Sequence, residues 1–156
     1  MTMKWPWQQK NEPLSTDEKV RLVQAIRLAE AGTSGEIRLY IDQKCKADTA
    51  ILRAEQVFVE LKMHQTKQRN AVLIYLAMTD RKFAIYADEG ALRATSSGYW
   101  HDLAAMLSVH FRDARFYEGL ILVVNTIGAR LAELFPPIED DENELPDDIV
   151  FGDDKS

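Results

Sequence analysis

Several of the acidic and amide residues of this chain stand at the ends of apolar runs, where a fold can gather them. Carboxylate and amide oxygens are the ligands that hard divalent cations such as calcium and magnesium prefer. The residues that fit this description are Glu36, Asn70, Asp88 and Glu89. Their types predict a cation site, with calcium as the expected ion and magnesium as the alternative, provided that the fold brings them together.

Two other interpretations of the same residues stay open. Two carboxylates with a metal ion can activate water for phosphoester hydrolysis. Strand ends also carry Asp and Asn simply because these residues favour turns. Other catalytic signatures are absent from the sequence: Ser96 and Ser97 have no partner base, and Cys45 has no histidine nearby. The sequence contains no phosphate-binding loop and no EF-hand loop.

A hairpin is expected to position two of these residues. The run over 71–78 carries no charge and is typical of a strand buried on both faces. A four-residue polar turn, 79–82, separates it from a second apolar run over 83–87. This turn is too short for a crossover, so the two strands should pair antiparallel. Antiparallel pairing brings Asn70 and Asp88 to the same edge of the sheet.

An earlier strand is expected to bring Glu36 to that edge. The stretch 36–42 alternates apolar and polar residues, and a helix with an apolar face opens at Asp48. Strand, helix and strand in this order form a right-handed βαβ unit with parallel strands. We call the edge where these parallel strands begin the near edge, and it also receives Thr33 and Ser34. The far edge receives Asp42, Asp80, Arg81 and Asp113.

Three further helices complete the expected elements. The first begins at Ser15, where Glu18 forms a capping box, and ends at Gly32. The others cover 98–110 and 117–135, and Pro136-Pro137 terminates the last. Residues 90–97 are expected to form a loop or short turn, and 111–116 a connection. The fold class is therefore α/β, with a mixed sheet built from the βαβ unit and the hairpin, followed by two C-terminal helices.

Charge and composition divide the chain into three parts. Residues 1–13, with Trp5 and Trp7, are an irregular leader, 14–137 form a single domain, and 138–156 form an acidic tail. From residue 139 onward there are nine acidic residues and one basic residue, which leaves 16 acidic and 18 basic residues in the rest. The tail would repel phosphates, so nucleic acid is not the expected partner. The single cysteine, the lack of a signal peptide and the lack of an apolar run long enough for a transmembrane segment together favour a cytoplasmic protein.

Five short motifs in a fixed order resemble the TPM domain, a family that includes the thylakoid-lumen acid-phosphatase-like proteins of plants. The resemblance extends from about residue 15 to 135. The short acidic tail of the chain and its lack of a signal peptide resemble the short soluble bacterial-type members of the family. The motifs are GTSGEIRLYI from Gly32, RNAVLIY from Arg69, DRKFAIYADEG from Asp80, GYW from Gly98, and FYEGL from Phe116 followed by IGARL from Ile127.

The resemblance implies a three-layer α/β/α sandwich and divalent-metal binding, chiefly of calcium. In some members it also implies phosphatase activity. The Asp-x-Gly motif of the family falls on Asp88 and Gly90, and its first-strand acid falls on Glu36. We therefore expect a calcium-binding, non-catalytic interaction module with a protein partner that the sequence does not identify. The alternative is a metal-dependent acid phosphatase-like hydrolase of phosphomonoesters. The oligomeric state is left open.

Overall fold

A four-stranded mixed sheet forms the centre of the computed structural model, which describes residues 14–138 and 149–152. The leader with Trp5 and Trp7 and most of the acidic tail lie outside the described residues. The strand order is β3-β2-β1-β4. The strands are β1 (Glu36–Asp42), β2 (Ala71–Ala77), β3 (Lys82–Ala87) and β4 (Ile149–Phe151).

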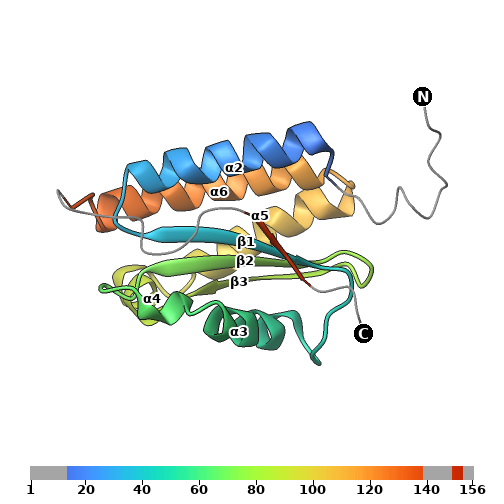
Figure 1. Cartoon of the computed structure of the whole chain (residues 1–156), viewed down its shortest axis with the longest axis horizontal. Coiled ribbons are helices and arrows are strands. Elements are labelled where there is room, and N and C mark those ends of the chain that lie inside the picture. The colour runs from blue at the N-terminus through green and yellow to red at the C-terminus, as the bar shows by residue number, and fades with distance from the viewer. Residues whose placement is uncertain (1–13, 139–148, 153–156) are drawn as a thin grey trace.

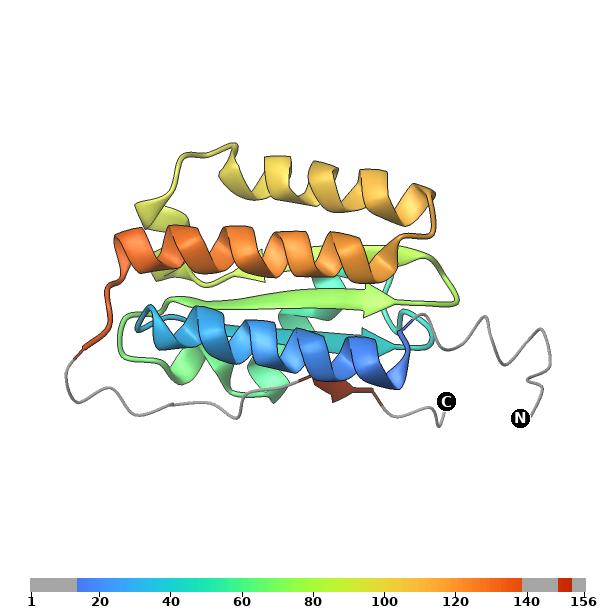
Figure 2. The same cartoon turned by 90° about the horizontal axis from the view of Figure 1, so that it is seen from above.

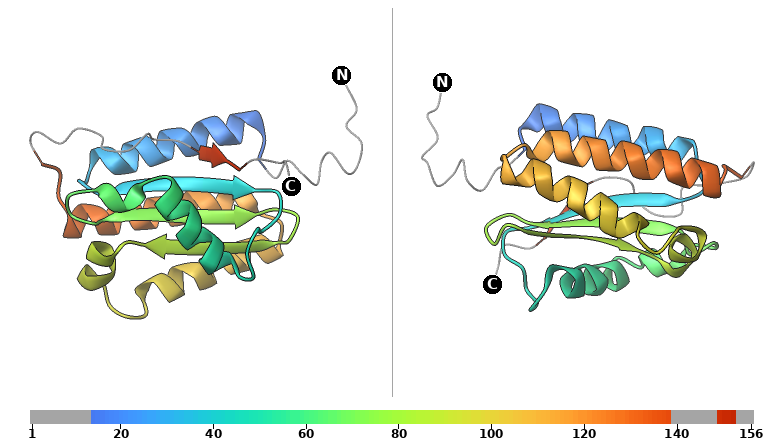
Figure 3. Two further views of the ribbon diagram at one scale, coloured as in Figure 1. Left: turned by 60° about the horizontal axis from the view of Figure 1, so that its bottom comes forward. Right: turned by 180° about the vertical axis from the view of Figure 1, so that it is seen from behind.

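Helices cover both faces of the sheet, which confirms the α/β/α sandwich (Figure 1). One face is covered by three helices that lie side by side when seen from above (Figure 2). These are α2 (Thr16–Ala31), α5 (Tyr99–Arg112) and α6 (Phe116–Leu134). The other face is covered by α3 (Ala50–Glu60), with the short α4 (Glu89–Ala94) at one end of the sheet (Figure 3). A 3₁₀ turn, Met63–Gln65, follows α3.

The pairing of the three long strands confirms the predicted βαβ unit and hairpin. β1 pairs with β2 in parallel, with Glu36 opposite Ala71. β2 pairs with β3 antiparallel, with Val72 opposite Ala87. All seven residues of β1 and all seven of β2 are buried, as expected for strands covered on both faces.

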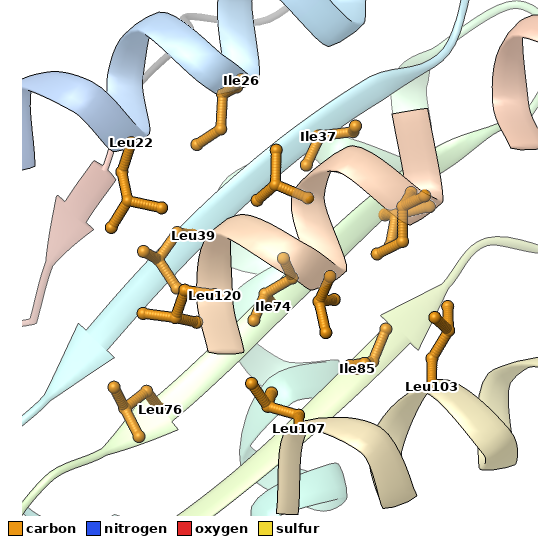
Figure 4. Packing of buried hydrophobic residues seen from close by; sticks show 14 of the residues in the cluster. Leu22, Ile26, Ile37, Leu39, Ile74, Leu76, Ile85, Leu103, Leu107 and Leu120 are labelled. Carbon is orange, nitrogen blue, oxygen red and sulfur yellow. The ribbon is translucent and has the colours of Figure 1, made fainter. Parts of the chain in front are cut away.

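Alternation along the strands divides the apolar residues into two cores. The larger core lies between the sheet and the helices α2, α5 and α6 (Figure 4). Ile37 and Leu39 of β1 and Ile74 of β2 pack there against the buried faces of these helices. The smaller core lies under α3, where Phe58 packs with Leu73 and its neighbours. The two cores fix which way each strand faces, and therefore which side chains reach the near edge.

The tail supplies a fourth strand that the sequence did not predict. β4 pairs in parallel with β1, with Leu39 opposite Ile149. Ile149 packs against the larger core and Val150 against the smaller one. The amide of Gly152 then donates to the carbonyl of Ile41 at 2.7 Å. Residues 149–152 thus extend the sheet beside β1.

Helix boundaries differ from the expected ones at three places. Residues 90–97 were expected to form a loop or short turn, but residues 89–94 of this region form the helix α4. The α3 helix is capped by Thr49 rather than opened by Asp48, because the Thr49 hydroxyl accepts a hydrogen bond from the amide of Leu52. The α5 helix continues to Arg112, so the connection to α6 is only three residues long. A six-residue helix is too short to show a helical period, which is why α4 was missed.

Candidate metal site at the near edge

The near edge lies where β1 and β2 begin and β3 ends, beside α4 (Figure 1). Glu36, Ala71 and Asp88 form one row across the sheet at this edge. Glu36 is opposite Ala71, and the amide of Asp88 donates to the Ala71 carbonyl at 3.0 Å. Neighbouring strands are about 4.8 Å apart, so the two acids begin about 10 Å apart on either side of an alanine. Both side chains are buried, with 4% of each residue exposed.

Asp88 is held by three hydrogen bonds. The Nε of Arg69 donates to Oδ2 at 2.7 Å, and Nη2 donates to Oδ1 at 2.9 Å. The amide of Glu89 also donates to Oδ1, at 2.8 Å, so Asp88 serves as the N-cap of α4. The pairing of a guanidinium with a carboxylate through two parallel hydrogen bonds is among the stronger polar contacts in proteins. Hydrogen bonding to Asp88 raises the pKa of Arg69 above its ordinary value.

Arg69 also reaches Glu89, and its backbone is fixed. Its Nη1 lies 3.5 Å from the Oε1 of Glu89. Its φ of 51° places it in the left-handed region, which turns the chain sharply before β2. Its carbonyl accepts hydrogen bonds from the amides of Gly90 and Ala91. A Cβ at Gly90 would lie 2.1 Å from the Gln68 carbonyl oxygen, so only glycine allows this close approach.

Asn70 lies in a second polar group at the same edge. Its Nδ2 donates to the hydroxyl of Ser34 at 3.3 Å, and Gln68 donates to the same hydroxyl at 2.9 Å. Its backbone amide donates to the hydroxyl of Thr66. Only 1% of Asn70 is exposed, and its Oδ1 atom accepts no hydrogen bond from the described residues. A buried oxygen without a hydrogen-bond donor lowers the free energy of unfolding unless a water molecule or an ion binds it.

The predicted site residues therefore occupy one edge in two groups. Asp88 and Glu89 share Arg69, while Asn70 shares Ser34 with Gln68. Glu36 lies in the row of Asp88, with the small side chain of Ala71 between them. Within residues 14–138 and 149–152, no three side chains of His, Cys, Asp or Glu gather as a metal-binding group. The oxygen donors fit a hard cation by their chemistry, and Arg69 is the group that a cation would have to displace.

The far edge holds a buried network that sequence reasoning did not assemble. Asp42 is 1% exposed, and its Oδ2 accepts hydrogen bonds from the Nε of Arg53 at 3.0 Å and from the hydroxyl of Tyr75 at 2.7 Å. Burial and the hydrogen bond to Asp42 raise the pKa of Tyr75. In the sequence, Arg53 stands among the apolar residues of the α3 helix, and a charged residue at such a position indicates a buried partner. Its partner lies on β1, and the network ties α3 to the sheet.

Comparison with known families and structures decides the identity of the fold. The family model of the TPM domain matches residues 8–130, which is most of the chain. This chain belongs to the TPM domain family. The family assignment predicted from the five motifs is therefore confirmed, and Glu36, Asn70, Asp88 and Glu89 all lie inside the matched range. No protein among those of curated function matches the chain significantly.

Two solved structures are similar to this TPM domain. The BA42 protein from the psychrophilic bacterium Bizionia argentinensis is 39% identical, with a TM-score of 0.81 over 89% of this chain and 95% of that one. The N-terminal domain of the cg2496 protein from Corynebacterium glutamicum is 11% identical, with a TM-score of 0.60 over 83% and 85% of the two chains. The second likeness shows the shared fold alone. None of the helices in the described part of the chain has the length and hydropathy needed to span a membrane.

Proposed function

We propose that this TPM domain binds a divalent cation, calcium first and magnesium second, at the near edge, and that it acts as a non-catalytic interaction module. The observation that carries the proposal is the Oδ1 atom of Asn70. It is a buried oxygen that accepts no hydrogen bond from the described residues, on an edge that also holds buried carboxylates. A bound cation would supply the missing partner for this oxygen.

The oxygen donors would hold the cation from both groups of the near edge. Asn70 would supply its amide oxygen, and Glu36, Asp88 and Glu89 would supply carboxylate oxygens. Calcium accepts six to eight oxygen ligands in flexible geometry, so donors from several elements suit it better than they suit magnesium. The cation would supply positive charge between the start of β1, the start of β2 and the start of α4. Its effect would be to hold these elements in one arrangement for a partner.

We also propose that the partner is another protein and that the chain works in the cytoplasm. The leader with Trp5 and Trp7 and the acidic tail are the segments that would make the contact. Aromatic residues are enriched at protein interfaces, and an acidic segment suits a basic surface. The leader and most of the tail lie outside the described residues, so this part of the proposal rests on their sequence alone.

A phosphatase-like hydrolase is the alternative function. The observation that favours it is the pair of buried carboxylates, Glu36 and Asp88, on either side of Ala71 in one row. Two acids with a metal between them can orient and activate water. In that case Asp88 would take part in the reaction, and replacing it would reduce hydrolysis of any phosphomonoester.

Thermal unfolding and hydrolysis together test the two functions. A ligand that binds only the native state raises the melting temperature. We expect calcium to raise the melting temperature of the wild type and of Asn125→Ala, a control at an exposed asparagine of α6, but not of Asp88→Asn. We expect no hydrolysis of p-nitrophenyl phosphate, with or without chelator. Calcium-dependent hydrolysis that Asp88→Asn abolishes would favour the alternative, and unchanged melting temperatures would contradict cation binding.

A further inference from the structure

We infer that Arg69 is an internal competitor of the cation: its guanidinium occupies Asp88 and Glu89 and must leave before a cation binds there. This inference rests on the proposed function and names how the same site is regulated. It goes beyond the donor set, because it assigns a role to a residue that holds no cation itself. The near edge would then exist in two states: in one, Arg69 binds the carboxylates of Asp88 and Glu89, and in the other, the cation binds them.

The hydrogen bonds of Asp88 leave little room for a cation in the first state. An ionised carboxylate offers about four lone-pair positions. The two nitrogens of Arg69 and the amide of Glu89 occupy three of them. The same guanidinium lies 3.5 Å from Glu89. A cation at this position would meet one remaining lone pair of Asp88 beside a positive charge, and both conditions oppose binding.

The side chain of Arg69 is partly exposed, although its backbone is held in place. The Arg69 carbonyl is held by the amides of Gly90 and Ala91, which keeps the turn before β2 in place. The Arg69 side chain, in contrast, is 40% exposed, while that of Asp88 is only 5% exposed. The guanidinium can therefore rotate into solvent without moving the sheet. The Asp88 carboxylate would then keep only the hydrogen bond from the amide of Glu89.

Removal of Arg69 should tighten calcium binding. In Arg69→Gln the competing charge is lost and the side chain is shorter, while the left-handed backbone cost stays similar. We expect the dissociation constant of calcium, measured from the amide shifts of residues 88–92 in the full chain, to fall about tenfold or more. That factor is about 1.4 kcal/mol of binding free energy. The matched control is Arg93→Gln, which removes an exposed arginine of α4 and should leave the constant unchanged.

The melting temperature gives a second readout. Without calcium, Arg69→Gln leaves the buried Asp88 with no opposite charge and should melt below the wild type, whereas saturating calcium should remove most of this difference. Arg69→Lys keeps the charge but cannot make the paired hydrogen bonds, so it should bind calcium with intermediate affinity. This variant replaces Arg69→Gln in the test if Arg69→Gln does not fold.

The possible results separate this inference from the proposed function. If Arg69→Gln and Arg69→Lys bind calcium no more tightly than the wild type, Arg69 is not a competitor of the cation. The proposed cation site would be unaffected by that result. No calcium-dependent shift in residues 88–92 of any variant, the wild type included, would overturn the proposed function and this inference together.

Discussion

At the scale of single residues, Gly90 shows how the near edge depends on a close backbone approach. A Cβ at this position would lie 2.1 Å from the carbonyl oxygen of Gln68 and 2.7 Å from that of Arg69. Gly90→Ala must therefore shift backbone atoms, and we expect it to lower the free energy of unfolding by about 2 kcal/mol or more. Urea unfolding would measure this change.

Gly98 provides the matched control for Gly90. A Cβ at Gly98 meets nothing within 4 Å, and its φ of −92° suits any residue. Gly98→Ala should change the stability by less than about 0.5 kcal/mol, because alanine reduces the entropy of the unfolded chain but is a poorer N-cap than glycine. Equal effects of the two substitutions would contradict the account of the near-edge turn.

The Asp42 network predicts a second effect at this scale. Removing one partner of a buried ion pair leaves the other charge uncompensated. We expect Asp42→Asn to lower the free energy of unfolding by about 3 kcal/mol, because Arg53 is buried with it. Tyr75→Phe should cost about 2 kcal/mol, the contribution of a hydrogen bond to a charged group. In a double-mutant cycle measured by urea unfolding, these two effects should not add, and full additivity would contradict the network.

Tyr75 also predicts how stability depends on pH. Its pKa is raised in the folded protein, so the folded state keeps the proton after the unfolded state has lost it. The stability that this group contributes is fully present below pH of about 10, the value in the unfolded chain, and is lost as the pH rises further. The difference in unfolding free energy between the wild type and Tyr75→Phe should therefore shrink by about 1.4 kcal/mol per pH unit above this point. A constant difference between pH 8 and pH 11 in urea unfolding would contradict this assignment.

The location of the candidate residues at one edge could be predicted from the sequence, but their contacts could not. The ends of apolar runs identified Glu36, Asn70, Asp88 and Glu89, because strand pairing alone places strand ends together. The role of Arg69 depends on a left-handed backbone that nothing in its residue type indicates. The same holds for Asp42, whose partners stand 11 and 33 positions away along the chain.

At the scale of elements, β4 is held to the sheet by a short strand and one glycine. A Cβ at Gly152 would lie 1.9 Å from the Oδ1 of Asp42, which is buried beneath it. We expect Gly152→Ala to detach β4, and the amide at position 152 should lose its protection in hydrogen exchange. Phe151→Ala is the control, because Phe151 is 52% exposed and packs into neither core. Full protection at position 152 in Gly152→Ala would contradict the close packing of Gly152 on Asp42.

The long elements could be read from the sequence because their periods are clear, and the short ones could not. β1 and the helices α2, α5 and α6 have enough residues for periodicity and caps to identify them, and β2 is identified by its long uncharged apolar run. The α4 helix has six residues and β4 has three, and both form because of distant contacts. Asp88 caps α4 while bound to Arg69, and β4 forms because the edge of β1 offers it a partner.

At the scale of the whole molecule, the near edge is where most of the chain converges. The ends of α2, α3 and α6 and the beginnings of β1, β2 and α4 all lie there (Figure 1). The amide of Ser34, after α2, donates to the carbonyl of Phe135 at the end of α6, and the hydroxyl of Thr33 donates to Leu131. A cation held by Glu36, Asn70 and Asp88 would therefore join elements from both layers of helices.

The measurement that tests this account most directly is a calcium titration of the full wild-type chain, followed by residue-resolved amide chemical shifts. We expect saturable shifts confined to residues 33–36, 69–70 and 88–92, and the same residues should respond more weakly to magnesium. Calcium also binds diffusely to runs of acidic residues, so shifts only in the tail, 139–144, would assign the binding to the tail. That result, or no shifts at the near edge at saturating calcium, would contradict the central claim.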